Sequence, residues 1–452
     1  MTLRLHDTAL GRVAELEPRD PGQVSMYVCG PTVYGDPHLG HGRFSLVFDV
    51  LRRYLEWSGL TVRYASNITD IDDKIISRAN AEGRSPADVA VQYEAAWYDA
   101  MDRLGVKRPD HDPHATAYVD QMVDLIAQLV AKHVAYATGD SVYLAVDAVP
   151  DYGLLARQPL DSLRAGARVE VDESKRNPLD FALWKLAKPG EPSWPSPWGA
   201  GRPGWHTECV VMSLDLLGDG FDLHGGGQDL AFPHHENERA QAVANGRTFA
   251  RRWAHNGFVT DPGGEKMSKS LGNFTTLGGL LDAGDARAYR LLVLQSHWRA
   301  PVEVTPTAVA QAGAALRGLD DFVRRAGDLP SQPADPGVVD RFRARMDDDL
   351  DTPGATAALF DAVKTANRAI DAGDGPAAAA QAAAVHEMAS AVGLTLARAD
   401  EIPAPILALA ADRETARKAR DFAAADALRG QLTAAGYTVE DTPQGPRVHR
   451  TA

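Results

Sequence analysis

The sequence predicts an α/β protein in which a parallel-sheet domain is followed by an α-helical bundle and a small C-terminal module. Two patterns lead to this prediction. Strand-like and helix-like segments alternate near the N-terminus, and Ala-rich segments with helical periodicity dominate beyond Thr305. At 452 residues the chain is too long for one compact core, so several domains are expected.

The first βαβ unit is the clearest element. Residues 24–29 alternate and are β-prone, a helical pattern runs from about 42 to 57, and a second strand follows at 61–66. This spacing predicts a Rossmann-like parallel sheet, whose ligand site lies beyond the carboxyl ends of its strands. Cys29 and Thr69 both fall at such ends.

The middle of the chain is less regular. From 115 to 204 the pattern is irregular and ends in a Pro- and Trp-rich stretch at 191–198, which is unlike a strand of a regular sheet. We interpret this region as an insertion into the α/β domain. Regular elements resume with a helix at 209–217 and a short strand at 220–224, before a glycine turn.

Helices dominate the C-terminal third. The stretches 311–326 and 377–392 predict helices of a bundle, and a Pro-containing break at 401–405 sets off a final module.

Composition limits the function classes. Two cysteines, Cys29 and Cys209, are too few for a disulfide framework or a four-cysteine zinc site. The net charge of −14 disfavours nucleic-acid binding without excluding it, because binding depends on the local surface. No apolar run reaches the roughly 20 residues that span a bilayer, and the N-terminus lacks the apolar stretch of a signal peptide. We therefore expect a cytoplasmic protein without a membrane partner.

The motif His38-Leu39-Gly40-His41 stands where the first helix begins. Helix N-termini offer free N–H groups and a positive dipole end, which suit a triphosphate. The two imidazoles can donate hydrogen bonds to oxygens that gain charge at an α-phosphorus, and Gly40 leaves room for an adenine ring. Alone, the motif is weak, because histidines flanking a turn also occur by chance.

A second motif, Lys266-Met267-Ser268-Lys269-Ser270, follows two glycines. Its lysines can neutralise a leaving pyrophosphate, although alone it would pass for a solvated basic turn. Together the two motifs resemble the signature of class I aminoacyl-tRNA synthetases. The resemblance implies ATP binding by His38, Gly40, His41, Lys266, Met267, Ser268 and Lys269, with His38, His41, Lys266 and Lys269 as catalytic residues.

Four further residues form a candidate zinc site. Cys29 and Cys209 supply thiolates, and His234 and Glu238 share a face if they lie on one helix. An exposed polar helix start explains His234 and Glu238 equally well, and spacing alone does not separate His234 from His235 as the ligand.

Longer segments resemble cysteinyl-tRNA synthetases nearly end to end. They are residues 27–34, 67–74, 201–209, 223–230 and 233–238. The one departure in a signature is Leu39, where Ile is usual. In that family, residues matching Cys29, Cys209, His234 and Glu238 hold zinc, which also contacts the substrate thiolate. Serine is a poor zinc ligand, so a separate editing domain is unnecessary.

The resemblance also implies a cysteine pocket lined by Gly30, Thr69, Trp205, His224 and Asp229. Asp229 suits the α-ammonium group and Trp205 an aromatic wall. Two alternatives stay open: Thr69 caps the next helix, or the glycines at 225–227 only make a tight turn. The acidic run at 70–73 is better explained as a first helical turn than as a magnesium site.

The final module contains seven Lys or Arg and seven Asp or Glu, so it is less acidic than the rest. Residues 416–426 place basic and acidic groups on one predicted helix, and 440–445 follow a predicted strand. A solvated helical hairpin is the plain alternative. The module resembles an anticodon-binding module, which implies tRNA contacts by Arg417, Phe422, Asp426 and Asp441.

The implied function is ATP-dependent activation of L-cysteine to cysteinyl-adenylate and its transfer to the 3′ terminal adenosine of tRNA(Cys). The implied cofactors are one Zn²⁺ per chain and Mg²⁺ with ATP, and we expect a monomer. A small-molecule cysteine ligase of the mycothiol type should lack residues 306–452. A catalytically silent paralogue would have no need to keep both motifs.

These inferences divide the chain into six segments. They are the first half of the catalytic domain (1–114), a connective insertion (115–204), the second half of the catalytic domain (205–255), the K-M-S-K-S loop and stem-contact region (256–305), the helical bundle (306–400) and the anticodon-binding module (401–452).

Overall fold

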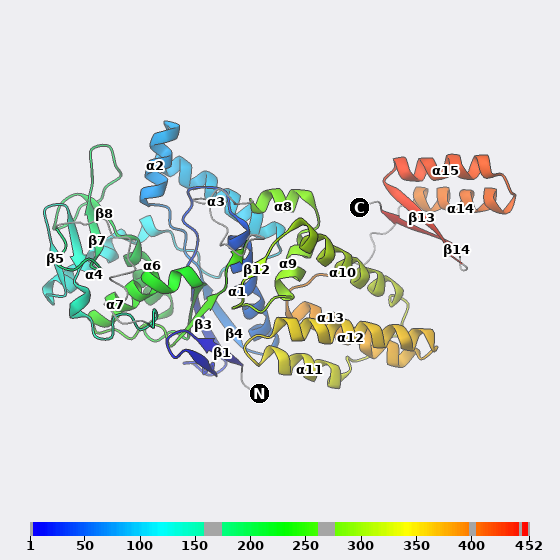
Figure 1. Cartoon of the computed structure of the whole chain (residues 1–452), viewed down its shortest axis with the longest axis horizontal. Coiled ribbons are helices and arrows are strands. Elements are labelled where there is room, and N and C mark those ends of the chain that lie inside the picture. The colour runs from blue at the N-terminus through cyan, green and yellow to red at the C-terminus, as the bar shows by residue number, and fades with distance from the viewer. Residues whose placement is uncertain (1–2, 158–173, 261–275, 397–403, 443–444, 451–452) are drawn as a thin grey trace. The chain divides into compact units, whose positions relative to one another are not determined.

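A computed structural model describes residues 3–157, 174–260, 276–396, 404–442 and 445–450 (Figure 1). The chain separates into two compact units. The first comprises Met1–Arg317 and Leu329–Thr395, and the second comprises Gly318–Asp328 and Leu396–Ala452.

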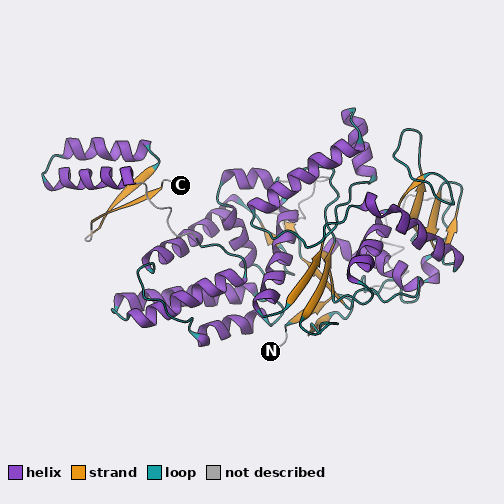
Figure 2. Cartoon of the chain, turned by 180° about the vertical axis from the view of Figure 1, so that it is seen from behind, coloured by secondary structure: helices purple, strands orange, loops and turns teal. Residues whose placement is uncertain are grey.

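The first unit is built around a four-stranded parallel sheet, drawn in orange in Figure 2. Its strand order is β10-β9-β3-β4. Its strands are β3 (Gln23–Val28), β4 (Thr61–Ala65), β9 (Leu223–Gly227) and β10 (Arg252–Asn256). Tyr27 of β3 lies opposite Ala65 on one side and His224 on the other. The predicted parallel βαβ unit is therefore confirmed, and the carboxyl ends of the strands meet at one edge.

Helix α1 (Leu39–Trp57) connects β3 to β4. Its buried face includes Leu46, Phe48, Leu51 and Leu55, each at most 2% exposed. Burying each of these side chains contributes on the order of 1.5–3 kcal/mol, so apolar packing fixes α1 against the sheet. The helix ends at Trp57, and the N–H of the C-cap Ser58 bonds back to the Tyr54 carbonyl.

The glycine run belongs to a strand, which corrects the predicted strand at 220–224 and the glycine turn after it. β9 continues through Gly227 because small residues are needed there. A Cβ at Gly225 would lie 2.3 Å from the Phe48 ring, and one at Gly226 would lie 2.7 Å from the His235 ring. The neighbouring rings occupy the space that side chains on this strand would fill.

The region predicted to be irregular contains a sheet of its own. Helix α4 (Val119–Ala131) precedes an antiparallel sheet with the order β5-β6-β7-β8. Its strands are β5 (Ala135–Ala137), β6 (Ser141–Leu144), β7 (Phe181–Leu186) and β8 (Gly201–Pro203). The Pro- and Trp-rich stretch 191–198 lies outside these strands, in the connection from β7 to β8.

The remaining elements of the first unit surround this framework. They are β1 (Arg4–Asp7), β2 (Arg12–Glu15), α2 (Asp73–Glu82), α3 (Pro86–Arg103), α6 (Trp205–Leu217), α7 (Glu236–Ala244), β11 (Val259–Thr260), α8 (Leu277–Ala283), α9 (Ala286–Leu294), β12 (Val302–Glu303), α11 (Pro336–Met346), α12 (Thr352–Asp371) and α13 (Gly375–Ala391). Helix α10 (Pro306–Arg325) extends from the first unit into the second. The helices predicted at 311–326 and 377–392 correspond to α10 and α13. Among the described residues, no helix is both long and apolar enough to cross a membrane.

The second unit pairs a helical hairpin with a β-hairpin. Helices α14 (Ala404–Lys418) and α15 (Phe422–Ala434) precede the antiparallel strands β13 (Tyr437–Thr442) and β14 (Gly445–Arg450). The single helix predicted over 416–426 is wrong, because Arg420 adopts a φ of 60° and Asp421 caps a new helix. Glu440 and Asp441 lie within β13 and do not follow it.

Candidate active site

A cavity of about 690 Å³ opens at the carboxyl end of the parallel sheet. Its walls come from the end of β3, the N-terminus of α1 and the segment after β10. The lining residues are Cys29, Gly30, Pro31, Thr32, Tyr34, His38, Gly40, His41, Phe44, Lys74, Trp97, Trp205, Gly227, Asp229, Leu230, Asn256, Gly257, Phe258 and Val259. The volume suits a small-molecule ligand, and the position is the one expected for a parallel α/β sheet.

His38 and His41 form a reciprocal cap at the start of α1. The Nδ1 atom of His38 accepts from the His41 backbone N–H at 3.2 Å, and Nδ1 of His41 accepts from the His38 N–H at 3.3 Å. The rings stack with centroids 3.7 Å apart. Because both Nδ1 atoms are acceptors, the proton of each neutral ring sits on Nε2, which makes both Nε2–H groups donors. Gly40 leaves room for this stacking, since a Cβ there would lie 3.0 Å from the His38 ring, closer than ordinary contact.

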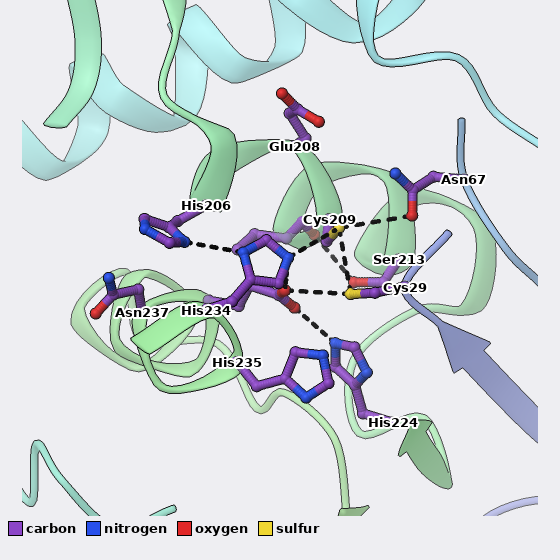
Figure 3. Close-up of polar contacts among 12 residues, drawn as sticks. Cys29, Asn67, His206, Glu208, Cys209, Ser213, His224, His234, His235 and Asn237 are labelled. Atoms are coloured by element: carbon purple, nitrogen blue, oxygen red, sulfur yellow. Dashed lines mark hydrogen bonds and ion pairs between the residues drawn. The ribbon is translucent and has the colours of Figure 1, made fainter. Parts of the chain in front are cut away.

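Cys29, Cys209, His234 and Glu238 converge beside this cavity, with their donor atoms all within 4.8 Å of one another. Figure 3 shows Cys29, Cys209 and His234 facing one another. Cys29 follows β3, Cys209 lies on α6, and Glu238 lies on α7. His234 lies in the kinked segment directly before α7 (Ala231–His235), in which Phe232 is extended, and the four-residue spacing brings its ring to Glu238. All four residues are at most 3% exposed.

The donor distances fit a tetrahedral zinc ion. The two Sγ atoms are 3.5 Å apart, and Cys29 Sγ lies 3.4 Å from Glu238 Oε1. Cys209 Sγ lies 3.8 Å from His234 Nε2, which in turn is 2.9 Å from Glu238 Oε1. Zinc bonded to sulfur at about 2.3 Å in tetrahedral geometry requires sulfurs about 3.8 Å apart. Two thiolates, one imidazole and one carboxylate are also chemically suited to zinc.

The charges of this cluster follow from its burial and from the close contacts among its own members. Burial lowers the pKa of His234, but the Glu238 carboxylate outweighs it and raises that pKa to about 10. Burial raises the pKa of Cys209, but contacts with Cys29 and His234 lower it to about 6. For Cys29, burial and the neighbouring Cys209 raise the pKa well above its usual value. A metal ion would therefore displace protons from Cys29 and His234.

A second set, formed by Cys29, His224, His235 and Glu238, also brings its donor atoms within 4.8 Å. Here, however, His224 Nε2 bonds Glu238 Oε2 at 2.6 Å, and His235 Nδ1 bonds His255 at 2.8 Å. The set contains one sulfur instead of two. His224 orients the Glu238 carboxylate, which both sets share.

Several residues that contact the cluster or line the cavity have no motif or spacing that identifies them. His206 Nδ1 lies 2.9 Å from His234 Nδ1, which orients the His234 ring (Figure 3). Asn67 accepts from the Gly30 N–H at 2.9 Å through Oδ1, which also lies 3.7 Å from Cys209 Sγ. Lys74 lines the cavity with its ammonium 5.3 Å from the Tyr34 ring centre. Both Asn67 and Lys74 fall in the 67–74 segment, but nothing in the sequence indicates their separate contacts.

The five residues predicted to form the cysteine pocket lie at different depths. Gly30, Trp205 and Asp229 line the cavity, and Trp205 stacks on His234 with ring centres 3.9 Å apart. Thr69 and His224 are at most 1% exposed and lie behind the lining. The Thr69 hydroxyl donates to Glu208 at 2.7 Å, and the N-cap of α2 is Asp72, so Thr69 does not cap that helix.

The acidic run at 70–73 is occupied by structural contacts. Asp70 accepts from the Thr116 backbone N–H at 2.9 Å, and Asp73 pairs with Lys185 at 2.6 Å and with Arg202. These contacts, with the Asp72 cap, agree with the predicted start of a helix.

The other predicted site residues fall outside the described residues or belong to the second unit. Lys266, Met267, Ser268 and Lys269 fall outside the described residues. In the second unit, Asp441 accepts two hydrogen bonds from Arg413 at 2.7 and 3.1 Å and pairs with Arg417. Phe422, at the start of α15, is 65% exposed. Asp426 lies on the same helix.

Three family models match the chain. The class I (C) tRNA synthetase catalytic domain matches residues 15–314, the DALR domain matches 341–397, and the cysteinyl-tRNA ligase anticodon-binding domain matches 399–448. The chain is 46% identical to a cysteine–tRNA ligase from Halorhodospira halophila, over 99% of this chain and all of the relative. It is 47% identical to one from Alkalilimnicola ehrlichii, over 98% of each.

Solved structures share the fold at low identity. The methionyl-tRNA synthetase of Mycobacterium tuberculosis, in complex with methionyl-adenylate, superposes with a TM-score of 0.62 at 15% identity and covers 82% of this chain and 89% of its own. A leucyl-tRNA synthetase from Agrobacterium radiobacter gives 0.57 at 12% identity and covers 84% of each chain.

Proposed function

Because the chain belongs to the cysteine–tRNA ligase family of class I aminoacyl-tRNA synthetases, we propose that it uses ATP to activate L-cysteine and charges tRNA(Cys) through a zinc-dependent selection of the thiolate. One observation carries the proposal. A buried cluster of two cysteines, a histidine and a glutamate borders the same cavity as the capped N-terminus of α1.

The metal ligands are Cys29, Cys209, His234 and Glu238. When bound there, zinc supplies a position that holds a thiolate far better than a hydroxyl group. A site that depends on one such partner can reject an analogue lacking it by about 10⁴-fold or more. The Asp229 carboxylate, which lines the cavity, holds the α-ammonium group, and Trp205 forms the aromatic wall.

In the first step, a carboxylate oxygen of cysteine attacks the α-phosphorus of ATP. The bond between the α-phosphorus and the α,β-bridging oxygen breaks, and pyrophosphate leaves with that oxygen. The Nε2–H groups of His38 and His41 donate hydrogen bonds to the phosphate oxygens that gain charge. Gly40 keeps the two rings stacked at the helix N-terminus, whose free N–H groups add to the favourable potential. Lys266 and Lys269 neutralise the leaving pyrophosphate, and ATP enters with Mg²⁺.

In the second step, a ribose hydroxyl of the terminal adenosine attacks the carbonyl carbon of cysteinyl-adenylate. The hydroxyl loses its proton as AMP leaves. Positioning supplies much of the acceleration, because both reactants are held in one cavity. Arg417, Phe422, Asp426 and Asp441 of the second unit contact the anticodon, and the enzyme acts as a monomer.

The test is charging of tRNA with a GCA anticodon, with cysteine and serine offered in competition, before and after zinc removal. We expect cysteine-only charging that is lost without zinc and returns when zinc is restored. Serine charging, or activity that does not depend on zinc, would contradict the thiolate mechanism. Adenylate formation without transfer to tRNA would indicate a small-molecule ligase, although the match to the anticodon-binding domain at 399–448 favours tRNA.

A further inference from the structure

We propose that Arg43 is a positioning residue for nucleotide binding, whose buried guanidinium sets the distance between the two walls of the cavity. One wall is the first turn of α1, and the other is the segment Asn256–Val259. The proposal rests on the proposed function, because it assumes that ATP binds between these walls.

Arg43 is 1% exposed, and within the described part of the chain its two Nη atoms donate only to backbone carbonyl oxygens, while its buried Nε has no partner. Its Nη1 bonds the carbonyl of Phe258 at 2.5 Å. Its Nη2 lies 3.3 Å from each of the carbonyl oxygens of His297 and Trp298 and also bonds that of Ala300. One side chain on α1 thus holds two other stretches of backbone.

The guanidinium has no carboxylate partner among the ion pairs of the described residues. Burial lowers its pKa to about 10, so it stays charged at neutral pH. Arg290 offers a contrast, because it is equally buried but pairs with Asp49 at 2.6 Å. A buried charge balanced only by carbonyl dipoles is costly, and an apolar residue of similar volume would hold the packing at lower cost. Arg43 therefore contributes the fixed geometry of its hydrogen bonds to the carbonyls of Phe258, Trp298 and Ala300.

Arg43 lies between two residues that line the cavity, His41 and Phe44. Its acceptor Phe258 lines the facing wall, together with Gly257 and Val259. The guanidinium thus connects the histidine motif to the opposite side of the nucleotide pocket.

The facing wall is itself tightly packed against the segment 297–302. Gly257 donates to the Trp298 carbonyl at 2.9 Å, and Val302 donates to the Phe258 carbonyl at 2.9 Å. A Cβ at Gly257 would lie 2.5 Å from the carbonyl oxygens of Arg299 and Ala300. The segments 257–258 and 297–302 cannot separate or slide without losing these contacts. A displacement of the Arg43 guanidinium would therefore displace Phe258.

Lysine cannot reproduce this arrangement. Arginine presents its N–H groups in a rigid planar fork, whereas an ammonium is a single point on a flexible stem. Arg43→Lys should keep the positive charge but lose part of the contacts that set the distance between the two cavity walls. Arg43→Met should lose both the charge and these contacts.

The experiment measures ATP–pyrophosphate exchange for Arg43→Lys and Arg43→Met, with Arg290→Lys as the matched buried-arginine control. We expect kcat/KM for ATP to fall by about 10-fold in Arg43→Lys and by about 10²-fold in Arg43→Met, the order of loss that follows a displacement of about 1 Å. KM for cysteine and the zinc content per chain should stay within about twofold of the parent enzyme. Arg290→Lys should lower the melting temperature without changing kcat/KM for ATP.

An unchanged kcat/KM for ATP in both Arg43 variants would overturn the proposal. So would equal losses for ATP and cysteine, or loss of zinc, because these would show a general structural role. If Arg43→Met does not fold, Arg43→Lys decides between the outcomes by the same comparison of the loss for ATP with the loss for cysteine. Failure of the proposed function is distinguishable, because the parent enzyme would then show no cysteine-dependent exchange.

Discussion

Gly30→Ala tests whether backbone packing beside Cys29 sets the metal site. A Cβ at position 30 would lie 1.6 Å from the backbone carbonyl oxygen of Asn67, and ordinary contact begins at about 3.4 Å. The two backbone segments would have to separate by about 1.8 Å, the difference between these distances. Because one of them carries the thiolate of Cys29, the shift exceeds the tolerance of about 0.2 Å for a metal ligand.

We expect Gly30→Ala to lower zinc affinity and kcat/KM for cysteine by at least about 10²-fold, since loss of a supporting contact alone costs 10- to 100-fold. The assays are zinc competition with a chelator and cysteine-dependent ATP–pyrophosphate exchange. Asn67→Ala removes the contacts of the Asn67 amide with the Gly30 N–H, the Thr69 hydroxyl and Cys209 Sγ, and adds no clash. It should therefore lose only about 10-fold in both assays.

Gly278→Ala is the control, because a Cβ at this helical position has open space. It should leave both assays unchanged and stabilise α8 by up to about 1 kcal/mol. The reasoning is refuted if Gly30→Ala binds zinc and activates cysteine within about threefold of the parent enzyme.

Three further predictions concern the metal, the fold and the tRNA. Zinc affinity should rise with pH from about 6 to 9, by up to about two decades per pH unit, because zinc must displace protons from Cys29 and His234, whose pKa values are raised. Chelator competition across this pH range measures the affinity, and a flat profile would contradict the assigned charges. Arg290→Met should lower the free energy of unfolding by about 3 kcal/mol, because it breaks the buried pair with Asp49; urea unfolding measures it, and a change below 1 kcal/mol would count against the pair's role. Phe422→Ala should leave pyrophosphate exchange and the melting temperature unchanged, because the Phe422 side chain is exposed. It should raise KM for tRNA about tenfold or more through lost base stacking, and an unchanged KM would exclude Phe422 as a stacking residue.

The parallel sheet could be predicted from the sequence where side chains alternate or form helical patterns, as in β3, α1 and β4. It was mispredicted where the neighbours, and not the strand itself, decide the conformation. β9 ends in glycines because Phe48 and His235 fill the space beside them. The strands of the insertion have three to six residues, too few for a period-2 pattern to stand out. The break at Arg420 depends on one positive φ angle, which arginine rarely adopts.

The candidate site was predicted residue by residue only through resemblance to a family. No pattern in the sequence indicates that Cys29 and Cys209, 180 positions apart, lie 3.5 Å from each other. The contacts of His206 and Asn67 depend on tertiary packing for the same reason. Helical spacing did foresee one contact, the 2.9 Å pair between His234 and Glu238.

The reciprocal cap of His38 and His41 bears on how such a motif evolves. An N-cap of this kind stabilises a helix by about 1 kcal/mol, independently of any reaction. Selection for a folded chain therefore favours these two histidines even where catalysis is lost. In a descendant that no longer charged tRNA, substitutions would replace the two histidines more slowly than residues that only bind substrate, such as Asp229. Retention of His38 and His41 is thus weaker evidence of activity than retention of Asp229, which lines the cavity, and it weakens the expectation that a silent paralogue would lose the histidine motif.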